Sequence, residues 1–381
     1  MKIVIAPDSF KESLSAWEAC QAIGRGLERV FPEAELVHVP MADGGEGTVQ
    51  SLVDATGGRI VRTTVTGPLG TPVEGFYGVL GDGKSAVIEM AAASGLALVP
   101  PEQRNPLVTT TRGMGELILS ALNEGVETII LGLGGSATND GGAGMAQALG
   151  IRLMTEDGTE IGYGGGELGR IAHIDMSGVD PRLARVKFIA ACDVDNPLVG
   201  ERGASAVFGP QKGATADMVK QLDANLTHYA SQVLADVGCD VAHMPGAGAA
   251  GGLGAGVVAF LQAELKRGVD IVVDATGLAE HAAGADMVFT GEGKIDGQTI
   301  YGKTPIGVAK AAKLHGIPVI GIAGTLAAGY ESVHEHGIDM VFTIVPGVTT
   351  LEDALQHASA NMERTAYNIG MTLKFGKLLK S

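Results

Sequence analysis

Near the start of the chain, short unbroken apolar runs alternate with segments in which apolar residues recur at helical spacing. Residues 3–6 are a continuous apolar run that ends at a proline, which is typical of a buried strand. A helical spacing of apolar residues follows over about 16–30, a second strand-like run covers 36–40, and another helical pattern ends at Gly57. Strands and helices that alternate in this order predict a parallel sheet with crossover helices.

The pattern changes after about residue 60 and returns near residue 271. Between these points the first segments alternate like antiparallel strands joined by glycine and proline turns, and helices and strands are then mixed. The simplest arrangement is an α/β fold in which 1–62 and 272–381 share one parallel sheet and 63–271 form an inserted second α/β domain. A cleft between two such domains is the expected position of a ligand site.

Charge and composition narrow the classes of partner. The 381 residues carry a net charge of −16, which argues against nucleic acid or an anionic membrane surface as a partner. The three cysteines are far apart and predict no disulfide framework, and no apolar stretch reaches the roughly 18 residues of a membrane span. The first residues turn polar too soon for a signal peptide, so a cytoplasmic location is expected. The oligomeric state is left open, and a homodimer is one option.

Three polar segments follow predicted strands of the parallel sheet. Asp8, Ser9 and Lys11 follow the first strand, "ADGGEGT" (42–48) follows the second, and "GEGKID" (291–296) is expected as a loop after a later strand. Ligands of parallel sheets bind beyond the carboxyl ends of the strands, so these segments are predicted to present acids, lysines and backbone amides to one pocket. Each segment alone could instead be a helix cap, a glycine turn or a solvated loop.

A glycine-rich segment of the middle region, "LGLGGSATNDGGAG", also lies between a predicted strand and a predicted helix. It contains Ser136, Thr138, Asp140 and Gly141. Such a turn can bind an anion through its backbone N–H groups and the dipole of the helix that follows. Glycine-rich loops are common, so this one alone is weak support for a phosphate site.

The segment "ACDVDNP" places two carboxylates two positions apart. Asp193 and Asp195 flank Val194 after a strand-like run, and in extended backbone they would point to the same side. Two carboxylates and the amide of Asn196 suit Mg²⁺, a cation that prefers oxygen ligands. The alternative is a capped turn before Pro197.

Several nucleotide-binding and metal motifs are missing from the sequence. It contains no GxxxxGK[ST] segment and no HExxH pair, and no predicted strand is followed by GxGxxG with an acid about 20 residues later. These absences exclude a P-loop enzyme and weaken a dinucleotide-binding interpretation.

Five separated motifs resemble one known family. They are "KIVIAPDSFKESLSA", "ADGGEGT", "GLGGSATNDGG", "ACDVDNPLVGERGASAVFGPQKGA" and the segment that begins "TGEGKID". In this order, from residue 1 to about residue 346, they resemble the glycerate kinases of the bacterial type-1 family. The resemblance implies ATP-dependent phosphorylation of D-glycerate with Mg²⁺, 2-phosphoglycerate as the usual product, and a cytoplasmic role in the breakdown of carbohydrate acids. It also implies a Rossmann-like domain with an inserted second domain.

Phosphoryl transfer needs positioning and neutralisation of charge, and this requirement assigns roles to the candidate residues. The catalytic candidates are Asp193 as the base, Asp8 behind it, and Lys11 near the phosphates or the glycerate carboxylate. The substrate- or nucleotide-binding candidates are Ser9, Gly44, Gly45, Ser136, Thr138, Asp140, Gly141, Lys294 and Lys303, with Lys212 as a further candidate. The metal candidates are Asp195, Asp43 and Glu292.

Two other classes of function remain as alternatives. A non-catalytic protein could close two lobes around a small carboxylate or a nucleotide, although the many ionisable groups in the loops argue against it. An oxidoreductase is disfavoured because the dinucleotide-binding motif is missing. The motifs leave open which glycerate hydroxyl reacts and which loop binds ATP.

Overall fold

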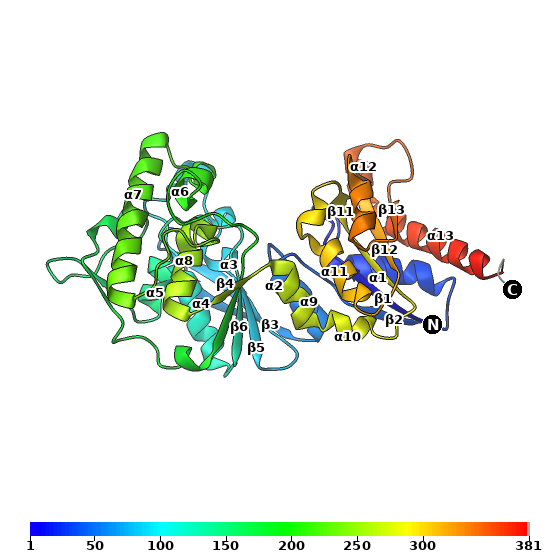
Figure 1. The fold of residues 1–381 in the computed structure, drawn as a ribbon, viewed down its shortest axis with the longest axis horizontal. Coiled ribbons are helices and arrows are strands. Elements are labelled where there is room, and N and C mark those ends of the chain that lie inside the picture. The colour runs from blue at the N-terminus through cyan, green and yellow to red at the C-terminus, as the bar shows by residue number, and fades with distance from the viewer. Residues whose placement is uncertain (379–381) are drawn as a thin grey trace. The chain divides into compact units, whose positions relative to one another are not determined.

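The computed structural model describes residues 1–378 and divides the chain into two compact units (Figure 1). The first unit contains 1–43, 50–57 and the chain from 269 onward. The second contains 44–49 and 58–268. The first unit joins segments that are distant in sequence, and each unit is described separately below.

The first unit is built on a five-stranded parallel sheet with the order β13-β12-β11-β1-β2. Its strands are β1 (Lys2–Pro7), β2 (Glu35–His38), β11 (Met287–Ile295), β12 (Val319–Leu326) and β13 (Met340–Thr343). The pairing of β1 with β11 brings the two ends of the chain into one sheet. The predicted α/β fold with a parallel sheet made from both ends of the chain is therefore confirmed.

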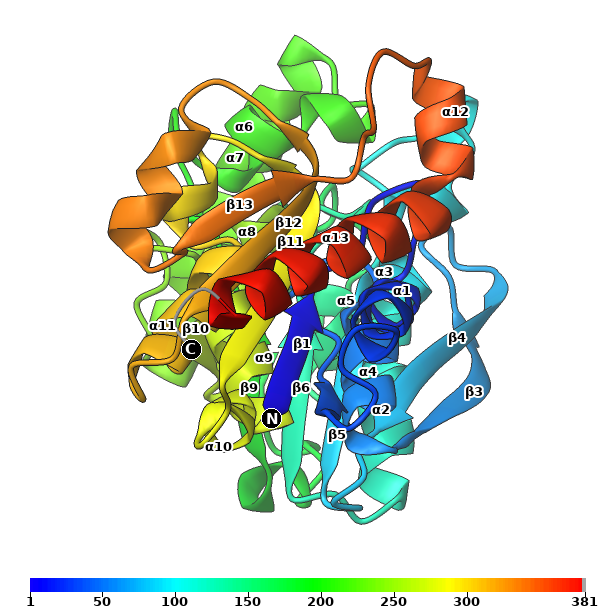
Figure 2. The same cartoon turned by 90° about the vertical axis from the view of Figure 1, so that its right-hand side faces the viewer.

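Helices connect and cover these strands. They are α1 (Ala16–Glu28), α2 (Thr48–Thr56), α9 (Gly268–Thr276), α10 (Leu278–Ala282), α11 (Thr304–Lys313), α12 (Leu351–Gln356) and α13 (Ala358–Leu378), with the 3₁₀ turns η7 (Thr299–Tyr301) and η8 (Tyr330–His336). Figure 2 shows α13 running across the strands of this sheet.

Helix α1 illustrates how the sequence determines this packing. The hydroxyl of Ser15 accepts a hydrogen bond from the N–H of Glu18, whose carboxylate accepts one from the N–H of Ser15, so a capping box begins the helix. Its apolar face, including Ile23, is fully buried in the core of the unit. Gly26 allows α13 to approach, since a Cβ there would lie 2.3 Å from the carbonyl oxygen of Glu363.

The second unit contains a six-stranded mixed sheet with the order β10-β9-β6-β5-β4-β3 and a separate pair, β7-β8. Its strands are β3 (Arg59–Thr66), β4 (Pro72–Val79), β5 (Ser85–Glu89), β6 (Thr128–Gly132), β7 (Arg152–Met154), β8 (His173–Asp175), β9 (Lys187–Ala191) and β10 (Glu264–Lys266). The predicted antiparallel segments are β3, β4 and β5, whereas β5, β6, β9 and β10 pair in parallel.

The helices of this unit surround one large apolar core. They are α3 (Ala91–Ser94), α4 (Arg112–Asn123), α5 (Ala143–Ala148), α6 (Ala204–Phe208), α7 (Ala216–Gln232) and α8 (Ala249–Leu261), with short turns that include η1 (Leu96–Leu98), η5 (Pro210–Lys212) and the π-turn η6 (Val233–Val237). Nowhere in residues 1–378 does a helix combine the length and apolar character needed to cross a bilayer.

One local prediction is wrong. "GEGKID" was expected to be a loop, but β11 continues to Ile295, and Glu292 and Lys294 pair in register with β12. The glycines that indicated a loop instead allow neighbouring strands to approach. A Cβ on Gly291 would lie 2.0 Å from the carbonyl oxygen of Ile322.

Candidate functional site

Asp8 lies directly after β1, at the carboxyl end of the parallel sheet of the first unit. One carboxylate oxygen accepts a hydrogen bond of 2.5 Å from the hydroxyl of Thr304, and the other accepts one of 2.6 Å from the N–H of Ser9. Burial, with a smaller contribution from the charge of Asp43, nevertheless raises the pKa of Asp8 from 3.8 to about 6. This carboxylate is held in place, but its negative charge is not compensated.

Glu292 lies near the end of β11 and is linked to the turn that follows. Its carboxylate accepts a hydrogen bond of 2.9 Å from the hydroxyl of Thr299 and lies 3.5 Å from the ammonium of Lys303. Burial raises the pKa of Glu292 to about 7, and Asp8 contributes to this rise, although Lys303 opposes it. Two partly buried carboxylates that disfavour each other's charge therefore lie at adjacent strand ends.

Asp8, Asp43 and Glu292 together form what we call the acid cluster. Asp43 and Glu292 each interact electrostatically with Asp8. Within residues 1–378 no group of three or more His, Cys, Asp and Glu side chains is arranged to hold a metal ion by itself. Carboxylates whose negative charge is disfavoured suit a divalent cation that takes only one or two protein ligands, as Mg²⁺ does when phosphate oxygens supply the rest.

Four other predicted residues lie near these strand ends. Ser9 donates its N–H to Asp8, and Lys303 pairs with Glu292. Lys294 forms an ion pair of 2.9 Å with Asp296, while Lys11 is exposed. Thr299 and Thr304, which position the two carboxylates, were not predicted. Their only signal in the sequence was their position shortly after "GEGKID".

The segment 42–48 is divided between the two units. Asp43 belongs to the first unit, whereas Gly44, Gly45 and Glu46 belong to the second. There they line a pocket of about 310 Å³ together with Gly132, the last residue of β6, and Gly134 and Gly135 of the loop that follows. Two predicted glycine-rich loops therefore meet at one hollow, which we call the glycine pocket.

Glycine at position 44 is required by this packing. The residue has a φ of +92°, and a Cβ there would lie 2.7 Å from the Cα of Gly268 and 2.9 Å from the Cβ of Ala191. Any side chain would be strained in this conformation and would also meet neighbouring atoms. The glycine therefore serves close packing at the edge of the pocket.

A buried carboxylate that was not predicted also lines the glycine pocket. Glu89 ends β5, and its carboxylate accepts a hydrogen bond of 2.8 Å from the N–H of Val49 in the first turn of α2. Burial raises its pKa, against the lowering effect of the backbone N–H groups around it. The N-terminus of α2, which follows "GGEGT" and could have bound a phosphate, is therefore already occupied by the carboxylate of Glu89. An acid directly after an apolar run was the signal that could have revealed it.

The loop 136–144 is buried, and its polar groups are largely used within the unit. Asp140 accepts hydrogen bonds from the N–H and hydroxyl of Thr111 and from the N–H groups of Gly142 and Gly144. Burial raises the pKa of its carboxyl, which these donors oppose. The N–H of Gly141 is bonded to the carbonyl of Gly251. These amides hold the loop rather than face solvent.

The remaining predicted groups of this loop are also enclosed. Ser136, Thr138 and Gly141 are buried, and Tyr229 donates its hydroxyl proton to the carbonyl of Gly141 at 2.9 Å. Lys212, a further phosphate candidate, is only 1 % exposed and donates to the carbonyl of Thr138 at 2.6 Å. Its ammonium supports the loop and does not reach the surface.

Gly134 and Gly135, just before this loop, differ from it. Both are exposed, and their N–H groups make no hydrogen bond within residues 1–378. Backbone amides without an acceptor therefore lie one and two residues before the loop that was predicted to bind the phosphates.

The two carboxylates of "ACDVDNP" have different surroundings. Asp193 follows β9 and accepts a hydrogen bond of 3.0 Å from the N–H of Gly268. Asp195 is 76 % exposed and pairs with Arg202 at 2.9 Å. The two side chains are therefore not presented as a matched pair of metal ligands, as extended backbone would have placed them.

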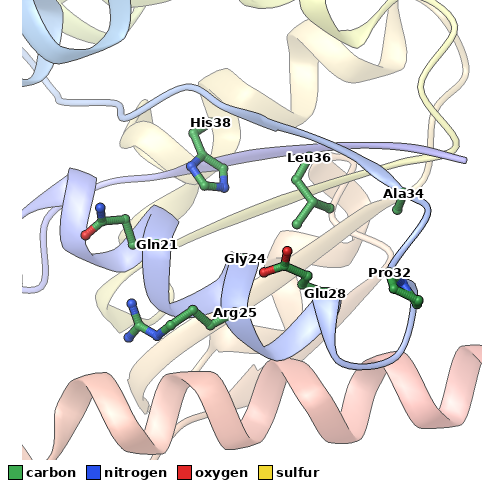
Figure 3. Close-up of a pocket in the computed structure, with 8 residues that line it drawn as sticks. All are labelled: Gln21, Gly24, Arg25, Glu28, Pro32, Ala34, Leu36 and His38. Atoms are coloured by element: carbon green, nitrogen blue, oxygen red, sulfur yellow. The ribbon is translucent and has the colours of Figure 1, made fainter.

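Two further hollows lie away from the predicted residues. One, of about 450 Å³, lies in the first unit between α1 and β2. Figure 3 shows its lining, in which the ring of His38 lies over Gly24. Arg25, a cationic side chain of this lining, donates a hydrogen bond to the carboxylate of Glu363 in α13. The other, of about 570 Å³, is an open polar hollow beside His228 in the second unit. Neither contains a residue that the sequence singled out.

Comparisons with known proteins cover nearly the whole chain. The model of the "Glycerate kinase family" matches residues 3–374. A glycerate kinase of Bacillus subtilis (strain 168) is 61 % identical over 379 residues, which are 100 % of this chain and 99 % of that protein. A glycerate 2-kinase of Escherichia coli (strain K12) is 57 % identical, with 99 % of each chain covered. The crystal structure of a candidate glycerate kinase 2 from Salmonella typhimurium LT2 is 56 % identical and has a TM-score of 0.92, again with 99 % of each chain covered.

Proposed function

The chain belongs to the glycerate kinase family and is an enzyme that phosphorylates glycerate, and from this premise we propose that ATP is the donor, D-glycerate the acceptor and 2-phosphoglycerate the product. The relative from Escherichia coli, a glycerate 2-kinase, supports reaction at the 2-hydroxyl. A cytoplasmic location is part of the same proposal, because ATP is available there.

The acid cluster is the observation on which the assignment of the catalytic region rests. Asp8 and Glu292 have raised pKa values, so their charged forms are disfavoured until a cation lies nearby. Mg²⁺ would be held by Asp43 and Glu292, and when bound it would neutralise charge on the phosphate oxygens. Asp195 remains a weaker metal candidate, because its carboxylate already pairs with Arg202.

Asp193 is the proposed base. In the reaction the 2-hydroxyl oxygen of glycerate bonds to the γ-phosphorus of ATP, and the bond from that phosphorus to the β-bridging oxygen breaks, so that ADP leaves. A carboxylate must accept or orient the proton of the attacking hydroxyl. The hydrogen bond from the N–H of Gly268 fixes one oxygen of Asp193 for this task.

The lysines at the strand ends of the first unit have a separate role. Lys11 is exposed, whereas ion pairs with Asp296 and Glu292 position Lys294 and Lys303, respectively. We propose that they attract the carboxylate of glycerate or the phosphates of ATP, which the net charge of −16 would otherwise repel. The N–H of Ser9 orients Asp8 in the same region.

A direct assay tests the proposal. ADP release from ATP is measured with D-glycerate, with L-glycerate, and without an acceptor, each with and without Mg²⁺. We expect release that requires both D-glycerate and Mg²⁺, and phosphorus NMR of the product should show a phosphomonoester on carbon 2. Binding of ATP or glycerate without any ADP release would instead support the two-lobed, non-catalytic binding protein. A phosphate on carbon 3 would contradict the assigned hydroxyl.

A further inference from the structure

The glycine pocket has walls of two kinds. The glycine backbone of 44–45, 132 and 134–135 forms one part of the lining, and Phe76, Leu96 and three alanines form the apolar part. Two carboxylates, Glu46 and Glu89, also line it, whereas no lysine or arginine does. All of these residues belong to the second unit.

This lining disfavours an anion. The carboxylate of glycerate would meet two acidic side chains and no cation, and like charges in a cavity repel strongly. The start of α2, which lies beside Glu89, offers no free positive end here, because Glu89 accepts the N–H of Val49. Neither glycerate nor the triphosphate therefore suits the interior of this hollow.

An uncharged flat heterocycle with hydrogen-bond donors suits it well. Apolar side chains and bare glycine backbone can cover both faces of such a ring, and carboxylates can accept bonds from an amino group or from sugar hydroxyls. The volume of about 310 Å³ lies at the lower end of the range of small-molecule pockets. The exposed N–H groups of Gly134 and Gly135 are available to the ring nitrogens of such a heterocycle, which accept hydrogen bonds.

We propose that the glycine pocket binds the adenosine part of ATP. This inference rests on the proposed function, in which ATP is the phosphoryl donor. It names the loops of the second unit that recognise the base and the sugar of the nucleotide.

Photolabelling of the wild-type enzyme tests this without any substitution. The protein is irradiated with 8-azido-ATP, digested with trypsin and analysed by mass spectrometry. We expect label in the peptide 85–104, which carries the apolar wall, and loss of that label when excess adenosine competes. Label confined to peptides of the first unit, such as those that contain 292–303, would overturn the assignment.

A pair of matched variants gives an independent test. Ala97 is exposed and lines the pocket, so Ala97→Trp should fill it, while Leu98→Trp adds the same ring to the next residue of η1, outside the lining. Calorimetry with adenosine and with ADP should show binding weakened at least tenfold by Ala97→Trp and unchanged by Leu98→Trp. The KM for ATP should rise in parallel, and the KM for glycerate should stay within twofold of the wild-type value.

The outcomes separate this inference from the proposed function. If the wild-type enzyme releases ADP with glycerate but Ala97→Trp binds adenosine normally, the pocket assignment is wrong and the kinase assignment stands. A rise in the KM for glycerate alone would give the pocket to the acceptor instead. Absence of glycerate-dependent ADP release from the wild-type enzyme would contradict the proposed function itself. If Ala97→Trp does not fold, the photolabelled peptide decides.

Discussion

The ammonium of Lys212 donates a hydrogen bond of 2.6 Å to the carbonyl of Thr138 inside the second unit. Asp140 lies close enough to favour its positive charge, yet burial lowers the pKa of Lys212 from 10.5 to about 7. A lysine that resembled a phosphate ligand in the sequence is thus a buried support for the loop 136–144.

The buried Lys212 predicts a particular dependence of stability on pH. Its pKa is lower in the folded protein, so the unfolded chain binds the extra proton between pH 7 and 10.5, and the free energy of unfolding should rise with pH in that window. The slope for one such group is at most about 1.4 kcal/mol per pH unit. Lys212→Met removes this contribution, so the rise in unfolding free energy from pH 7 to pH 9 should be about 1–2 kcal/mol smaller than in the wild-type protein. Urea denaturation at the two pH values measures the difference.

Lys220→Met is the matched control for that prediction. Lys220 lies on α7 in the same unit, is 80 % exposed and pairs only loosely with Asp217 at 3.5 Å. Its removal should leave the pH dependence as in the wild-type protein. Equal pH slopes for wild type and Lys212→Met would show that the buried ammonium costs the folded protein nothing.

Glu89 provides a second prediction, on the stability of the helix start. Glu89→Ala leaves the buried N–H of Val49 without its acceptor, and an unsatisfied buried donor costs about 1–2 kcal/mol. Glu89→Gln keeps an oxygen in place and should lose less than half as much. Urea denaturation of both variants at pH 7.5 measures this, and equal losses would mean that the acceptor itself is unimportant.

The order of strands and helices could be predicted from the sequence, because the spacing of apolar residues and the positions of turn residues depend directly on the local secondary structure. The runs at 3–6 and 36–40 and the helical spacing over 16–30 correspond to β1, β2 and α1. The end of β11 was misjudged because its glycines look like a loop in the sequence. They are needed for close strand contact, which depends on partners distant in the chain.

The candidate site could be predicted only in part, for a related reason. Residue type and position after a strand indicated Asp8 and Glu292, since the parallel sheet places such residues together. Whether a polar group faces solvent or supports a loop depends on what packs around it. Asp140 and Lys212 are enclosed by residues as distant as Thr111 and Tyr229, and no local pattern records those contacts.

Asp8 provides a third prediction, on the conflict between stability and function. Its folded pKa of about 6 exceeds the usual 3.8, so the folded protein holds the proton more tightly, and the resulting stability is present below pH 4 and lost as the pH rises through 6. Asp8→Asn has no charge to bury and should be more stable than the wild-type protein by about 1–3 kcal/mol at pH 7.5, with a gain that shrinks toward pH 4. Its kcat should fall at least about tenfold.

Chemical denaturation between pH 4 and 8, together with steady-state kinetics, checks both parts of that prediction. Thr304→Val is the matched comparison, because it removes the 2.5 Å hydrogen bond to Asp8 but keeps the carboxylate. It should be less stable than the wild-type protein at pH 7.5, opposite in sign to Asp8→Asn. A loss of stability in both variants would mean that the charge of Asp8 is well compensated.

The proposed base gives the last prediction. Asp193→Asn keeps an oxygen that can accept the N–H of Gly268, so the fold and the KM values should change little. The amide cannot accept the proton of the attacking hydroxyl, so kcat should fall by about 100-fold or more, in line with the usual contribution of a general base.

Steady-state kinetics at several Mg²⁺ concentrations distinguish the loss of a base from the loss of a metal ligand. Activity lost with a metal ligand would be partly restored by added Mg²⁺. Asp217→Asn, on the exposed start of α7, is the control for a change of charge alone. Activity of Asp193→Asn within a few-fold of the wild-type value would transfer the role of base to Asp8, because that carboxylate is the other candidate at a strand end.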